Sequence, residues 1–198
     1  MNKLQKKLAG GGRASLAEIT DLYQNGSTKD LQDCAQIIRS RFHHPKVATF
    51  LKMAIVNYTN ICVAKCDYCA FYRLPHQKGT YLLSFEQITA KIDALLTLGG
   101  TMVAFNGGFH PGLKIFDYAE LFGKVHSKYP DIGFYEMTIA EFMFSCKRSR
   151  LSYEEGALIL QKAGTEWITG GGAEILVDSF RQRHSPGKYQ VQDYYQAQ

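Results

Sequence analysis

Short apolar runs alternate with amphipathic segments from residue 51 onward. Four runs are short enough to be single strands, at 53–56, 102–105, 132–135 and 167–169. The last three are centred about 31 to 33 residues apart, the length of one βαβ repeat. Helices are predicted between them and after them, at 84–99, around 118–125, at 152–164 and at 173–180. This alternation predicts a parallel α/β sheet of about four βα units.

Four such units are about half of an α/β barrel, which usually takes about 250 residues, and the chain has 198. An open four-stranded sheet exposes apolar edges. We therefore expect either a fragment of a longer protein or a barrel completed by another chain, including a second copy. Residues 1–50 are predicted to form a helical N-terminal cap, with helix starts at Ser15 and Ser27. Residues 51–198 are predicted to form the N-terminal half of the barrel.

Charge and hydropathy exclude several classes of protein. The 23 basic and 18 acidic residues give a net charge of +5, with the basic residues scattered, so we expect no nucleic-acid partner. The N-terminus has no apolar signal region and no uncharged run is suited to span a bilayer, so we expect no membrane partner and a cytoplasmic location. In that compartment the five cysteines are not expected to form disulfides.

Three of the cysteines, Cys62, Cys66 and Cys69, fall within eight residues in a C-x3-C-x2-C pattern. The pattern follows the first predicted strand, at the strand end where α/β barrels build their chemistry. Three thiolates suit a four-iron cluster with one open iron. Two alternatives remain, a zinc site with His76 as the fourth ligand and a set of structural thiols.

The motif resembles that of radical S-adenosylmethionine (SAM) enzymes, whose fold is a full or partial α/β barrel. The flanking segments narrow the resemblance to the family of cyclic dehypoxanthine futalosine synthases; they are Asn57 to Cys62, Cys69 to Arg73 and Gly170 to Leu176. The resemblance runs from about Leu16 to Tyr194. The chain departs from the family at Asn106, at Thr138 to Glu141 and in the segment ahead of Asn57.

The resemblance implies the cofactors and a set of site residues. Cys62, Cys66 and Cys69 would hold a 4Fe-4S cluster, and SAM would bind its open iron. Gly107 and Gly108 match the glycine-rich segment that receives the amino group of SAM, with a plain turn as the alternative. Tyr68 would pack near the adenine of SAM. The remaining candidates are Glu174, for a ribose hydroxyl of SAM or of the substrate, and His110, for polarising a substrate carbonyl or carboxylate.

The activity implied is cyclisation of dehypoxanthine futalosine to cyclic dehypoxanthine futalosine in menaquinone biosynthesis, through a 5′-deoxyadenosyl radical. The implied partners are a small-molecule nucleoside substrate and an electron donor such as flavodoxin or ferredoxin. Sibling activities are an alternative: an aminofutalosine synthase, or the tyrosine-using subunit of a deazaflavin (FO) synthase. An alternative of another class is a truncated, non-catalytic fragment that still binds metal.

Overall fold

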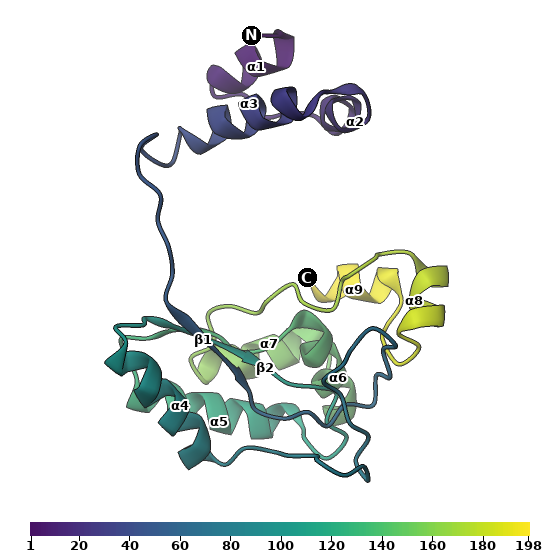
Figure 1. Cartoon of the computed structure of the whole chain (residues 1–198). Helices are drawn as coiled ribbons and strands as arrows, with labels where there is room; N and C mark the ends of the chain where they lie inside the picture. The colour runs from purple at the N-terminus through teal and green to yellow at the C-terminus, as the bar shows by residue number, and fades with distance from the viewer. The chain divides into compact units, whose positions relative to one another are not determined.

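The computed structural model describes residues 1–198, which form two compact units, Met1–Phe50 and Leu51–Gln198. The first unit contains three helices, α1 (Lys3–Ala9), α2 (Leu16–Asn25) and α3 (Thr28–Arg39), drawn in purple and blue in Figure 1. The sequence patterns predict α2 and α3 but not α1. Asn2 starts α1 by accepting a hydrogen bond from the Gln5 amide at 2.8 Å.

The second unit is an open α/β sheet. Its strands are β1 (Met53–Asn57), β2 (Met102–Asn106) and β3 (Gly133–Tyr135), paired in parallel in that order. Its helices are α4 (Phe85–Thr97), α5 (Ile115–Lys128), α6 (Ile139–Ser149), α7 (Tyr153–Lys162), α8 (Asp178–His184) and α9 (Val191–Ala197). The predicted α/β class with parallel strands is confirmed.

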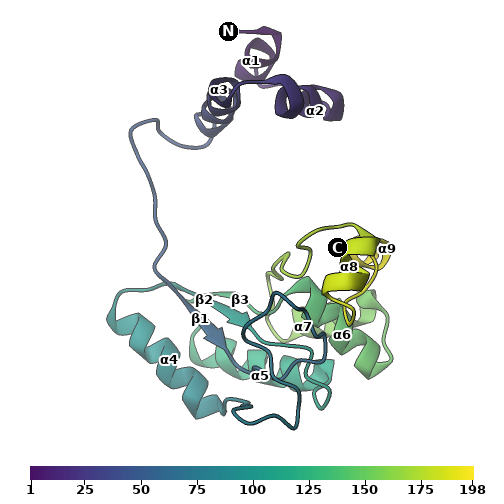
Figure 2. The same cartoon turned by 45° about the vertical axis from the view of Figure 1, so that its right-hand side comes forward.

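Helices α4 and α5 cover one face of this sheet, as Figure 2 shows. The strands contribute buried side chains to that face, among them Val56, Val103 and Phe105. The ring of Phe105 lies 5.6 Å from that of Phe122 on α5. Burying one such side chain stabilises a fold by about 1.5 to 3 kcal/mol. This core fixes the carboxyl ends of β1 and β2, where the candidate site lies.

The prediction of a fourth strand at 167–169 is wrong. This segment does lie beside the chain that follows β3, because the Thr169 amide donates to the Met137 carbonyl at 2.9 Å and the Ile139 amide donates to the Thr169 carbonyl at 2.8 Å. It forms only an isolated parallel bridge between Thr138 and Thr169. The pairing ends because its neighbour turns into α6 directly after Thr138. The sheet therefore has three strands.

Two further helices differ from the prediction. The helix expected at 173–180 begins only at Asp178, because Gly172 and Glu174 take left-handed backbone conformations with φ of 96° and 41°. Helix α6, which the sequence patterns did not predict, is started by Thr138: its hydroxyl accepts from the Glu141 amide at 3.2 Å. Both segments contribute residues to the candidate site, Glu174 from the first and Glu141 from the second.

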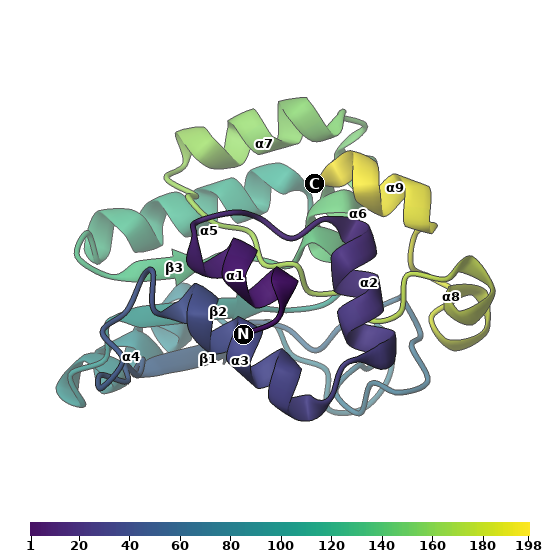
Figure 3. The same ribbon diagram turned by 90° about the horizontal axis from the view of Figure 1, so that it is seen from above.

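The other face of the sheet is open within the second unit. Ile55 is 60% exposed, and Met53 and Trp167 are also exposed. Ala104 and Tyr135 lie on the same face, beside Ile55 in the parallel register. Seen from above in Figure 3, β1, β2 and β3 lie side by side in that order. No helix is long and apolar enough to cross a bilayer.

Candidate functional site

The three cysteines lie on the long loop that joins β1 to α4. Asn60 holds the far part of this loop, because its side-chain amide donates to the Gly79 carbonyl at 2.9 Å and accepts from the Tyr81 amide at 2.9 Å. The Cys62 amide donates to the Arg73 carbonyl at 3.0 Å. The loop is therefore folded back on itself and held by polar contacts, without a disulfide.

All three thiols of the motif line one cavity of about 430 Å³. Cys66 is buried, and Cys62 and Cys69 are half-buried. Lys65 takes a left-handed conformation with φ of 54°, which turns the chain between the first and second cysteine. The other two cysteines, Cys34 and Cys146, are buried elsewhere. The structure therefore gathers the three predicted ligands at one site.

Burial favours the protonated form of two of these thiols, Cys62 and Cys66. Burial raises the pKa of Cys62, against the backbone amides of Ala64 and Phe109, which lower it. Burial also raises the pKa of Cys66, against the nearby ammonium of Lys188. Metal binding releases such protons, because only the thiolate is a ligand.

The donor set fits a cluster better than a single ion. No group of three or more His, Cys, Asp or Glu side chains is gathered closely enough to hold one metal ion, and His76 does not line the cavity. A four-iron cluster takes one thiolate for each ligated iron, so its ligands surround a space and do not converge on a point. Cys62, Cys66 and Cys69 around one cavity fit that arrangement.

Gly107 and Gly108, which follow β2, form the floor of the cavity. A Cβ atom on Gly108 would lie 2.6 Å from the Cβ of Cys62, and one on Gly107 would lie 2.4 Å from the ring of Tyr58. The Phe109 amide donates to the Cys62 sulfur at 3.3 Å. Only glycine permits the end of β2 to approach the cysteine loop this closely.

The predicted residue Glu174 also lines the cavity, on the segment that carries Gly171 and Gly172. The buried Arg181 of α8 holds this segment in place. Its guanidinium donates to the carbonyls of Gly172 at 3.2 Å, Ala173 at 2.8 Å and Tyr189 at 2.8 Å. These contacts hold the backbone directly before Glu174 in place.

Lys188, which the sequence analysis did not single out, connects two predicted residues. Its ammonium lies 2.6 Å from Glu174 Oε1 and donates to the Tyr68 hydroxyl at 3.3 Å. Burial, the largest single effect, lowers the pKa of Lys188, but the hydrogen bond to Glu174 and the electrostatic effects of Cys66, Glu174 and Tyr68 together outweigh it, so the pKa of Lys188 is raised. Tyr68, Glu174 and Lys188 therefore form one charged and hydrogen-bonded wall of the cavity.

Glu141, another residue that sequence analysis missed, lies at the base of the cavity and is 5% exposed. One oxygen accepts from the Gly107 amide at 2.9 Å and from the Tyr58 hydroxyl. The other accepts from the Thr138 hydroxyl at 2.7 Å and from its amide at 3.1 Å. Burial raises the pKa of Glu141, against these hydrogen bonds. The Thr-x-x-Glu capping box was the sequence signal for this residue.

The structure does not place His110 at the cavity. Its Nδ1 accepts a hydrogen bond from the Gly112 amide at 3.1 Å, which closes a local turn after β2. Burial lowers the pKa of His110, so the ring is neutral at pH 7. In this structure the ring of His110 therefore stabilises a turn after β2.

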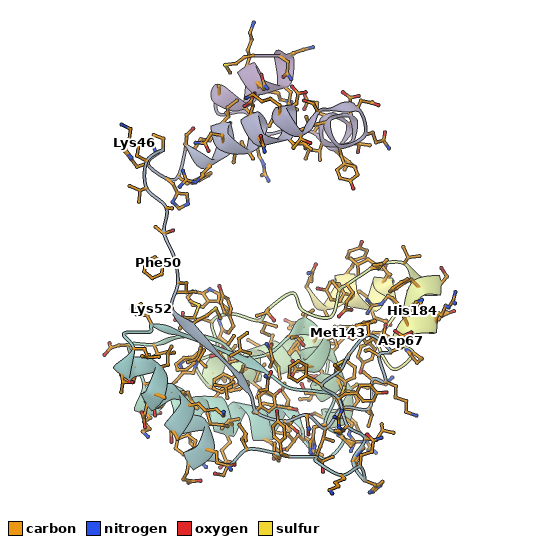
Figure 4. The ribbon with its side chains drawn as sticks, in the orientation of Figure 1. Lys46, Phe50, Lys52, Asp67, Met143 and His184 are labelled. Atoms are coloured by element: carbon orange, nitrogen blue, oxygen red, sulfur yellow. The ribbon has the colours of Figure 1, made fainter.

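A second contact joins the cysteine loop to the C-terminal segment. The Asp67 carboxylate lies 2.7 Å from His184 Nδ1, and the two side chains are labelled side by side in Figure 4. The Asp67 amide donates to the His184 carbonyl at 2.9 Å, and the Gly187 amide donates to the Ala64 carbonyl at 3.0 Å. Residues 184–188 thus hold the inner part of the C-x3-C-x2-C loop.

The amino-acid sequence is similar to those of several proteins of known name. No protein-family model matches the chain. It is 34% identical over 180 residues to "Cyclic dehypoxanthine futalosine synthase" of Halalkalibacterium halodurans, covering 91% of this chain and 49% of the relative. It is 30% identical over 185 residues to the same-named protein of Streptomyces coelicolor, covering 92% and 46%. With "Aminodeoxyfutalosine synthase" of Thermus thermophilus, identity is 29% over 185 residues, covering 93% and 50%. The chain thus spans about half the length of the curated relatives it matches.

Solved structures share the fold at low sequence identity. Methylornithine synthase (PylB) matches with a TM-score of 0.52 and 16% identity, over 81% of this chain and 56% of that one. The FeFe-hydrogenase maturase HydG from Carboxydothermus hydrogenoformans matches with a TM-score of 0.52 and 17% identity, over 84% and 46%. These matches support the sheet and helix arrangement described above.

Proposed function

Because this chain is a homologue of cyclic dehypoxanthine futalosine synthase and related radical SAM enzymes over about half of their length, we propose that it binds a 4Fe-4S cluster and SAM. Cys62, Cys66 and Cys69 hold the cluster in this proposal. The main observation that supports this proposal is that three cysteines without disulfides line one cavity. When bound, such a cluster supplies the electron that cleaves SAM into methionine and a 5′-deoxyadenosyl radical.

The chain's own residues bind and orient SAM. Gly107 and Gly108 bring backbone close to the cysteine loop, where their carbonyls receive the amino group of SAM. Tyr68 offers an aromatic face for the adenine, and Glu174 offers a carboxylate for a ribose hydroxyl. Ala64 and Phe109 are buried at the same cavity and exclude water from the cluster side.

The substrate we propose is dehypoxanthine futalosine, which is cyclised to cyclic dehypoxanthine futalosine. The similarity to two proteins named for that product supports it. The second candidate is a sibling reaction. It is supported by 29% identity to the aminodeoxyfutalosine synthase and by 32% identity over 145 residues to "5-amino-6-(D-ribitylamino)uracil--L-tyrosine 4-hydroxyphenyl transferase" of Cyanothece sp.. An electron donor such as flavodoxin or ferredoxin, and a chain that completes the barrel, belong to the same proposal.

Separate assays with each candidate substrate test the assignment. The chain is reconstituted anaerobically with iron and sulfide, then given SAM, dithionite and one substrate at a time. The substrates are dehypoxanthine futalosine, an enolpyruvyl benzoate, and tyrosine with 5-amino-6-ribitylaminouracil. We expect 5′-deoxyadenosine and a cyclised product only with the first, and neither from Cys66→Ser. A coupled product with another substrate would show that the chain catalyses the sibling reaction instead. Iron uptake without any SAM cleavage would favour a non-catalytic metal-binding fragment.

A further inference from the structure

Lys188 and Glu174 form a pair of opposite charges on the wall of the cysteine cavity. Their charged atoms lie 2.6 Å apart; the Lys188 side chain is 10% exposed and that of Glu174 is 33% exposed. Both residues line the same cavity as Cys66. Water and salt screen the largely buried Lys188 charge only weakly and screen the partly exposed Glu174 charge more. Both charges act on the Cys66 thiol, in opposite directions.

The pair is fixed from both sides. Gly187, the residue before Lys188, approaches the cysteine loop so closely that a Cβ atom there would lie 2.6 Å from the Cα of Ala64. The Lys188 ammonium also lies 5.6 Å from the centre of the Tyr68 ring. Tyr68 belongs to the short segment between Cys66 and Cys69. Glu174 is held by the Arg181 contacts to the preceding carbonyls. These contacts hold the backbone beside both residues at the cavity.

The two charges have opposite effects on a redox group that gains negative charge when it is reduced. A nearby ammonium stabilises the reduced state and raises the reduction potential, whereas a nearby carboxylate lowers it. We propose that Lys188 and Glu174 act as positioning residues that set the reduction potential of the cluster at Cys62, Cys66 and Cys69. This inference rests on the proposed function, because it requires the cluster to bind.

The test measures the midpoint potential of the reconstituted full chain, by one-electron reduction with dithionite followed by electron paramagnetic resonance. We expect Lys188→Met to shift the potential to a more negative value and Glu174→Gln to shift it to a more positive value. The double variant should return toward the wild-type value, and Lys188→Arg, which keeps the charge, should leave it nearly unchanged. If the two residues had only a structural role, their substitution would not shift the midpoint potential in opposite directions.

A matched control uses another lysine and acid pair. Lys128 and Asp93 lie 3.9 Å apart, both well exposed and away from the cavity, so Lys128→Met and Asp93→Asn should leave the potential unchanged. Shifts of the same sign for Lys188→Met and Glu174→Gln, or no shift in either, would overturn the inference. If the wild-type chain still takes up iron in that case, the proposed cluster binding stands. A wild-type chain that takes up no iron would overturn the proposed function, and the inference with it.

Discussion

The Glu141 carboxylate accepts a hydrogen bond from the Gly107 amide at 2.9 Å, across 34 residues of sequence. Glu141 lies in the first turn of α6, and Gly107 directly follows β2. The same oxygen accepts from the hydroxyl of Tyr58, directly after β1. One buried carboxylate therefore connects the ends of two strands to the start of a helix, at the base of the cysteine cavity.

Removal of this carboxylate should destabilise the second unit. Glu141→Ala leaves the buried donors of Gly107 and Thr138 without an acceptor, and we expect it to lower the free energy of unfolding by about 3 kcal/mol. Glu141→Gln keeps one acceptor oxygen and should cost less. Tyr58→Phe removes a single hydrogen bond and should cost about 1 kcal/mol. Urea denaturation followed by circular dichroism measures these differences, and equal stability of all four proteins would contradict the role given to Glu141.

Gly108 should be essential for iron binding. The Cβ atom of Gly108→Ala would lie 2.6 Å from both the Cys62 Cβ and the Ile61 carbonyl oxygen, so the cysteine loop must move. We expect the iron content after reconstitution to fall several-fold, as measured by a colorimetric iron assay. Gly123→Ala is the matched control, because Gly123 lies within α5 and its added Cβ meets nothing closer than 3.7 Å. That variant should bind iron normally and gain about 0.5 to 1 kcal/mol of stability.

The pair of half-buried His126 and buried Glu136 should make stability depend on pH. His126 Nε2 lies next to Glu136 Oε1; burial raises the pKa of Glu136 to about 8 and lowers the pKa of His126. The folded pair therefore keeps one proton up to about pH 8, whereas the unfolded chain has lost both above about pH 6.5. Since the folded state binds more protons in that window, stability falls there as the pH rises, by at most about 2 kcal/mol.

Glu136→Gln tests this dependence. Because the amide does not titrate, we expect the variant to lose the fall in stability between about pH 6.5 and 8. The measurement is the free energy of unfolding at several pH values for both proteins. A fall of the same size in the variant would show that other groups cause it.

The open face of the sheet should promote association of the second unit. Ile55 and Met53 of β1 and the nearby Trp167 are exposed apolar side chains on this face. We expect sedimentation velocity to show dimers or larger species that shift toward monomer in Ile55→Lys. A stable wild-type monomer at micromolar concentration would contradict this expectation.

The sequence predicted those parts of the site that depend on local spacing. Cys62, Cys66 and Cys69 are close in the chain, so their pattern alone placed them on one loop after β1. Lys188 was missed because its contact with Tyr68 spans 120 residues, and no local pattern reports such a contact. Glu141 was missed for a related reason: its capping box indicates a helix start, but the link to Gly107 exists only after β2 and α6 pack together.

The strand and helix predictions failed where tertiary contacts override local preference. Residues 167–169 have the composition of a strand, yet their neighbour leaves the sheet at Thr138 to begin α6. Helix α8 starts late because Glu174 takes a left-handed conformation, which sequence patterns do not reveal for a non-glycine residue. The helices α4 and α7 were predicted well, because Ser84 and Ser152 mark their starts with local capping boxes.

The central claim is that Cys62, Cys66 and Cys69 hold a cluster that binds SAM. The most direct measurement is electron paramagnetic resonance of the chain after anaerobic reconstitution and reduction, with and without SAM. We predict a four-iron signal that changes when SAM is added, that is lost in Cys62→Ser, Cys66→Ser and Cys69→Ser, and that persists in Cys34→Ser. A wild-type chain without such a signal, or with a signal that does not respond to SAM, would contradict the account.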